Sequence, residues 1–266
     1  MDAHLDRPGA RIAYSVSGPS DAPHALVVTH ALATSREWED EAGILDWSPV
    51  ADAGARLVRY DSRGHGASSG DAVTDHFRWP FLAEDLLSVA DAVAPDRPVD
   101  ALGESTGCGT LLWAVLAAPQ RFRRLVLVIP PTRGQARAEQ AELYTGAAEM
   151  IEVLGIESWQ RLVAAAVPAP ILQAGGWARV TRIAVKHDLL PAVLRGAAAS
   201  AFPDDDALST IAQPTLILAW DTDPSHPLET AEHLAQRLPN STLEIATTPD
   251  AIRGWGGRAA AFLARD

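Results

Sequence analysis

Short runs of apolar residues alternate along the chain with segments in which apolar positions recur every three to four residues. The runs have the length of strands, and the clearest span residues 25–29, 57–60, 99–102, 125–129, 215–219 and 243–246, with an early edge strand at 11–17. Helical spacing predicts helices over residues 81–93, 106–117, 229–238 and 258–264. This alternation predicts an α/β fold, in which a doubly wound, mostly parallel sheet is covered on both faces.

The segment from residue 132 to residue 206 breaks this alternation. It carries helical patterns and turn signals at Gly155, Pro168 and Pro170, and it lies between two predicted core strands. We therefore expect a core made of residues 1–131 and 207–266, with a helical lid at 132–206. Four lid side chains are candidates to line a pocket, although such residues more often pack within their own subdomain: Gln140, Tyr144, Trp159 and Trp177.

Composition narrows the class of protein. The chain has 266 residues, of which 47% are hydrophobic, enough for one large core. A net charge of -12 makes nucleic acid and anionic membranes poor partners, and no signal peptide or long apolar run is apparent. The single cysteine, Cys108, excludes an intramolecular disulfide and a cysteine-rich zinc site. We expect Cys108 to pack in the core and the protein to be cytoplasmic.

The most informative motif is Gly-Glu-Ser-Thr-Gly at residues 103–107, which follows a predicted strand and precedes a predicted helix. In a G-x-S-x-G motif at this place, the small residues allow a sharp turn that exposes the serine hydroxyl near the positive end of the helix. Ser105 is therefore the candidate nucleophile of an α/β-hydrolase.

Three further segments resemble the α/β-hydrolase superfamily. Residues 61–68 follow a strand and have the pattern D-x-R-G-H-G-x-S, in which His65 fits a hydrogen-bonded turn better than a base. Residues 30–34 resemble the His-Gly oxyanion loop of the family, with Ala31 in place of the usual glycine. Residues 214–227 resemble the strand and loop that carry the catalytic acid, with Trp220 in place of a glycine. The spacing to Pro227 favours Asp223 over Asp221 as the acid.

The order of these motifs is similar to that of 3-oxoadipate enol-lactonases, small carboxylesterases and cofactor-free haloperoxidase-type hydrolases. The resemblance implies an eight-stranded, mostly parallel sheet with a helical lid between the sixth and seventh strands. It implies a small-molecule substrate and no metal or organic cofactor. It also implies an oxyanion hole made by the backbone N–H groups of Leu32 and Thr106.

The family's usual general base is missing from the sequence. In the family order, a histidine follows the last strand, but no histidine occurs beyond His233 and the expected place falls near Asp250. Three interpretations remain open. His226, on the same loop as Asp223, acts as the base; the chain has the fold without a working triad; or Asp250 serves as a weak base. His187, in the lid, is a further candidate.

These observations predict a serine hydrolase that cleaves a small carboxylic ester or lactone through an acyl-enzyme. Ser105 attacks, His226 is the base and Asp223 orients it, because triads are defined by geometry rather than by order in the chain. The alternative is a hydrolase-fold protein that binds a small molecule or catalyses a non-hydrolytic reaction.

Overall fold

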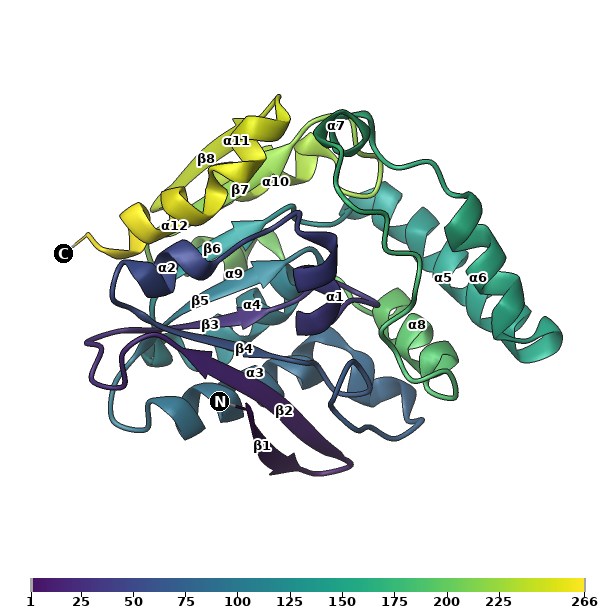
Figure 1. Ribbon diagram of the computed structural model, residues 1–266, viewed down its shortest axis with the longest axis horizontal. Helices are drawn as coiled ribbons and strands as arrows, with labels where there is room; N and C mark the ends of the chain where they lie inside the picture. The colour runs from purple at the N-terminus through teal and green to yellow at the C-terminus, as the bar shows by residue number, and fades with distance from the viewer. Residues whose placement is uncertain (1, 266) are drawn as a thin grey trace.

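The computed structural model describes residues 2–265 and contains one eight-stranded sheet in the order β1-β2-β4-β3-β5-β6-β7-β8 (Figure 1). Its strands are β1 (Asp2–Arg7), β2 (Ala10–Ser17), β3 (Ala25–Thr29), β4 (Arg56–Tyr60), β5 (Val99–Glu104), β6 (Phe122–Val128), β7 (Thr215–Trp220) and β8 (Ser241–Ala246). β2 pairs antiparallel with both neighbours, and every pair from β4 to β8 is parallel. The predicted α/β fold with a mostly parallel, eight-stranded sheet is confirmed.

Helices cover both faces of the sheet, and this double cover explains the apolar runs in the sequence. Outside the segment between β6 and β7, the helices are α1 (Arg36–Ala42), α2 (Ser48–Asp52), α3 (Trp79–Val93), α4 (Thr106–Ala117), α10 (Leu228–Arg237), α11 (Pro249–Arg253) and α12 (Trp255–Leu263), with 3₁₀ turns at Thr74–Phe77 and Pro119–Arg121. Val27 of β3 packs with residues of α3, α4 and α10, whereas the next residue, Val28, packs with residues of α2, α11 and α12. Cys108 is buried with the α3 and α4 residues, as expected.

The segment between β6 and β7 holds five helices, and the three longest of them stand to one side of the sheet in Figure 1. They are α5 (Gly134–Leu154), α6 (Ile156–Ala165), α7 (Pro170–Gly175), α8 (Leu190–Ala198) and α9 (Asp205–Ser209). Residues of α5 and α8 share a small apolar core with Phe77. We call residues 132–206 the helical insert; that it acts as a lid remains a prediction.

The structure adds elements that the apolar pattern does not signal. β1 has a largely polar sequence and lies at the sheet edge, paired only with β2 on one side. α1 and α2 are short, so their helical period is not repeated often enough to stand out. Within residues 2–265, no helix is both long enough and apolar enough to cross a membrane.

Candidate active site

Ser105 occupies the turn between β5 and α4, with φ 50° and ψ -114°. This positive φ is unusual for a residue with a side chain, and it turns the chain sharply at the end of the strand. The flanking glycines permit it: a Cβ on Gly103 would collide with the carbonyl oxygen of Gly107, and one on Gly107 with that of Thr29. The Ser105 N–H donates to the carbonyl of Val128 at 2.9 Å, which fixes the turn to β6.

The structure brings the three predicted catalytic side chains into one hydrogen-bonded chain. The Oγ of Ser105 lies 2.8 Å from Nε2 of His226, and Nδ1 of His226 lies 2.8 Å from Oδ2 of Asp223. An ionised carboxylate only accepts hydrogen bonds, so Nδ1 carries the proton and Nε2 is left to accept from the serine hydroxyl. This is the arrangement in which an imidazole can take a proton from serine.

Trp220, in the place of the family glycine, helps to hold the acid. Its Nε1 donates to Oδ2 of Asp223 at 3.1 Å, and the N–H of Ser225 donates to Oδ1 at 2.9 Å. Burial opposes ionisation of Asp223, but the hydrogen bonds from His226, Ser225 and Trp220 outweigh it and lower the pKa of the carboxyl. The Trp220 ring stacks on Trp255, with centroids 5.8 Å apart. Sequence comparison with the family pattern marked Trp220 as a departure but gave no sign of this donor.

The other candidate bases lie elsewhere. The Asp250 carboxylate is 2.8 Å from Arg253, and its side chain is 92% exposed. His187 is exposed, and His233 pairs with Asp205 at 2.7 Å. Neither these residues nor Asp221 line the cavity at Ser105.

His65 and His30 are buried and hold loops together, which agrees with the structural interpretation of both. Nδ1 of His65 donates to the carbonyl of Arg63 at 2.8 Å, and burial lowers the pKa of His65 to about 3. His30 accepts from the N–H of Ser62 at 2.9 Å and donates to the carbonyl of Ala31 at 2.7 Å. The loop after β3 is thereby tied to the loop after β4.

Leu32 and Thr106, which would supply the two oxyanion donors, both line a small cavity of about 20 Å³. Thr106 is the first residue of α4, and the first N–H groups of a helix have no partner within it. Leu32 lies in the loop after β3, where Ala33 has a φ of 61°. Alanine thus replaces the family glycine at position 31, and the left-handed backbone conformation occurs two residues later, at Ala33. The role of these two N–H groups stays a proposal.

A cavity of about 860 Å³ opens at Ser105 and is lined by both the core and the helical insert. From the insert, Gln140, Tyr144 and Trp159 line it, whereas Trp177 does not. Trp177 instead lies beneath the guanidinium of Arg253, 5.0 Å from its ring centroid. Across residues 2–265, no three His, Cys, Asp or Glu side chains are grouped as a metal ion would require.

Comparison with known proteins places this site in a family. A family model described as alpha/beta hydrolase fold matches residues 24–249. The chain belongs to the alpha/beta hydrolase fold family. This confirms the resemblance drawn from the motifs, and the predicted enzyme class, a carboxylic ester hydrolase, agrees with it.

Individual alpha/beta hydrolases are similar to the chain over most of its length. A 3-oxoadipate enol-lactonase of Acinetobacter baylyi is 24% identical over 259 residues, covering 90% of this chain and 86% of the relative. A rhodomycin D methylesterase of Streptomyces is 27% identical over 265 residues, covering 85% and 83%. The crystal structure of an enol-lactonase from Burkholderia xenovorans has a TM-score of 0.77 and 17% identity, covering 99% of this chain and all of the other, which shows the shared fold.

Proposed function

We propose that the protein is a serine hydrolase that cleaves a small carboxylic ester or lactone through an acyl-enzyme on Ser105. The observation that carries this proposal is the hydrogen-bonded chain from the Ser105 hydroxyl through His226 to Asp223. Relatives whose names specify an enol-lactonase and a methylesterase support a carboxylic ester or lactone as the substrate.

In the proposed reaction, Ser105 Oγ attacks the ester carbonyl while His226 Nε2 accepts its proton. Asp223 stabilises the imidazolium and keeps Nδ1 protonated, and the N–H groups of Leu32 and Thr106 bind the oxyanion. The imidazolium then protonates the leaving alkoxide. Water, deprotonated by the same imidazole, hydrolyses the acyl-enzyme and regenerates the serine.

The helical insert would act as the lid of this site, because its residues line the same cavity as the nucleophile. The alternative of a binding protein without hydrolysis was motivated by the missing histidine after β8. The imidazole of His226, 2.8 Å from the Ser105 hydroxyl, supports the hydrolytic function instead.

Labelling with a fluorophosphonate probe and hydrolysis of p-nitrophenyl esters test the proposal. We expect the wild-type protein to be labelled at Ser105, and Ser105→Ala to lose both labelling and nearly all turnover while keeping its circular dichroism spectrum. Failure of the folded wild type to react with the probe, or full turnover in Ser105→Ala, would overturn the proposed function.

A further inference from the structure

The cavity at Ser105 is unusually acidic for its apolar lining. Four carboxyl side chains line it, those of Glu39, Glu104, Glu142 and Asp223. Arg182 is the arginine among the lining residues, but its guanidinium is paired with Glu41 at 2.9 Å. A negatively charged substrate would therefore meet carboxylates in the cavity wall and an arginine that is already engaged.

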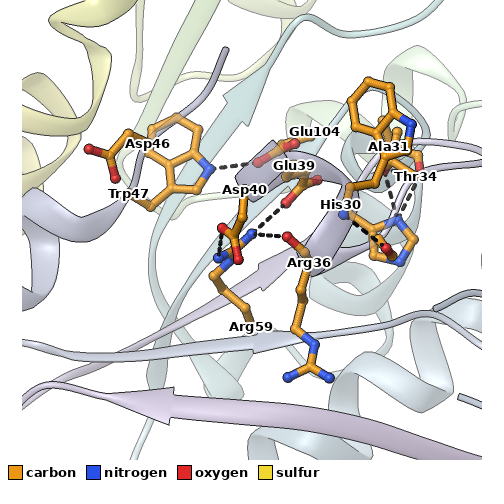
Figure 2. A network of polar contacts seen from close by, with 12 residues as sticks. His30, Ala31, Thr34, Arg36, Glu39, Asp40, Asp46, Trp47, Arg59 and Glu104 are labelled. Atoms are coloured by element: carbon orange, nitrogen blue, oxygen red, sulfur yellow. Dashed lines mark hydrogen bonds and ion pairs between the residues drawn. The ribbon is translucent and has the colours of Figure 1, made fainter. Parts of the chain in front are cut away.

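Two of these carboxyl groups, Glu39 and Glu104, form a buried pair beside the nucleophile (Figure 2). Glu104 immediately precedes Ser105 and is 1% exposed; Glu39, on α1, is 6% exposed. The indole Nε1 of Trp47 donates to Oε1 of Glu104 at 2.6 Å, and Nη2 of Arg59 donates to Oε2 of Glu39 at 3.2 Å. The two carboxyl groups lie close enough that each alters the pKa of the other.

Two buried carboxyl groups this close together repel strongly if both are ionised, so one of them keeps its proton. Oε1 of Glu39 is buried and has no hydrogen-bond partner among the residues that the structure describes, so a negative charge there would be unsatisfied and we assign the retained proton to it. Burial and the neighbouring Glu104 raise the pKa of Glu39 well above its usual range, and burial raises that of Glu104. The pair then holds one proton and one negative charge, as closely spaced carboxyl groups do.

Arg59 does not neutralise this charge alone. Its Nη1 lies 2.6 Å from Oδ1 of Asp40, a largely exposed carboxylate, so the one guanidinium is shared between Asp40 and the glutamate pair (Figure 2). Arg59 is also absent from the cavity lining. Arg59, Asp40 and the glutamate pair together carry one net negative charge. Of these residues, the two glutamates line the cavity.

We propose that the Glu39–Glu104 pair is a specificity element, which makes the pocket accept uncharged or cationic esters and reject esters that carry a carboxylate. This inference rests on the proposed function and names the substrate class of the same site. A charge held in a buried wall acts through a medium of low dielectric constant and is screened little by salt. Once a substrate displaces water from the cavity, like charges repel strongly and an ammonium group is attracted.

Three p-nitrophenyl esters of similar length test the proposal: the hexanoate, the 6-aminohexanoate and the half-ester of adipic acid. We expect kcat/KM of the wild type to be at least about tenfold lower for the adipate than for the hexanoate, with the aminohexanoate equal to or better than the hexanoate. Measurement at about 0.15 M salt screens exposed charges but not the buried pair.

Glutamine variants separate the charge of the pair from its shape. Glu39→Gln leaves one negative charge on Glu104, so it should keep the discrimination against adipate. The double variant Glu39→Gln/Glu104→Gln keeps an amide pair that Trp47 and Arg59 can still bond, but it removes the charge and should bring the adipate within about threefold of the hexanoate. Glu142→Gln, which removes an exposed carboxylate of the same cavity, is the matched control and should change little.

Equal kcat/KM of the wild type for adipate and hexanoate would overturn the inference, even if the double variant did not fold. A folded double variant that discriminates against the adipate as strongly as the wild type would also overturn it. So would a Glu142→Gln variant that loses as much of this discrimination as the double variant. Hydrolysis of the hexanoate that is lost in Ser105→Ala would leave the proposed function intact in each of these cases. Absence of hydrolysis of every ester would instead count against the proposed function.

Discussion

The loops after β7 and β8 begin side by side, because the two strands are parallel and paired along their whole length. The loop after β7 carries both Asp223 and His226, which bond to each other, and His226 also bonds to Ser105. The loop after β8, where the family histidine is usual, leads instead into α11 and Arg253. Nη2 of Arg253 donates to the carbonyl of Gly175 at 2.6 Å and thus contacts α7 of the helical insert.

A catalytic triad constrains positions in space rather than a place in the chain, so the proposed triad can take its base and its acid from one loop. An imidazole needs only to stand between an acid and the serine, and a loop that already carries the acid can supply it three residues later. The neighbouring loop, without the histidine, packs against the insert that helps to form the cavity. We expect the two loops to respond differently to substitution.

The largest expected effect is that of His226→Ala. Without a base, Ser105 is a poor nucleophile, so kcat for p-nitrophenyl esters should fall on the order of 10³-fold or more. Ser105→Ala should cause a comparable loss, and the double variant should lose no more than either alone, because the pair acts as a unit. Steady-state kinetics check this, and near-normal turnover of His226→Ala would place the base on another loop.

The core of the fold and the three hydrogen-bonded residues Ser105, His226 and Asp223 could be predicted because their signals are local in the sequence. Strand-length apolar runs reflect a sheet covered on both faces, and Ser105 and Asp223 follow strands that end at one edge. His226 was one of several candidates, and spacing alone did not choose among them. The Glu39–Glu104 pair was beyond prediction, because it joins a short, unpredicted helix to β5 through tertiary packing. The donor role of Trp220 was missed for the same reason.

Trp220→Phe, at the end of β7, is expected to lower kcat less than His226→Ala does. Phenylalanine keeps a ring to stack on Trp255 but removes the N–H that donates to Asp223. A lost hydrogen bond to a charged group corresponds to about 1.5–3 kcal/mol, so kcat should fall roughly 10- to 100-fold with KM little changed. Trp255→Phe is the control, since it alters the stack without touching Asp223. Equal losses in both variants would mean that stacking, not the hydrogen bond, positions the acid.

After β8, Arg253→Ala should lower the stability of the protein and loosen the helical insert, but it should leave the rate of the chemical reaction nearly unchanged. The substitution removes the hydrogen bond to Gly175 and the contact of the guanidinium with the Trp177 ring. Because Arg253 is substantially exposed, we expect a loss of about 0.5–1 kcal/mol in the free energy of unfolding. Limited proteolysis should cut residues 166–182 faster, while kcat for p-nitrophenyl acetate stays within about twofold. A large fall in kcat would show that this loop takes part in catalysis.

The smallest expected effect tests most directly whether the loop after β8 can supply the base. In the His226→Ala background, Asp250→His restores a histidine near the usual family position, yet we expect no recovery of turnover. The Asp250 side chain is 92% exposed and directed to Arg253, and it does not line the cavity. Added imidazole, by contrast, can enter the space that the His226 side chain leaves in the cavity wall, and should raise the rate of His226→Ala measurably. Rescue by imidazole without rescue by Asp250→His would show that the base must come from the β7 side. Recovery of turnover by Asp250→His would mean that the β8 loop also reaches Ser105.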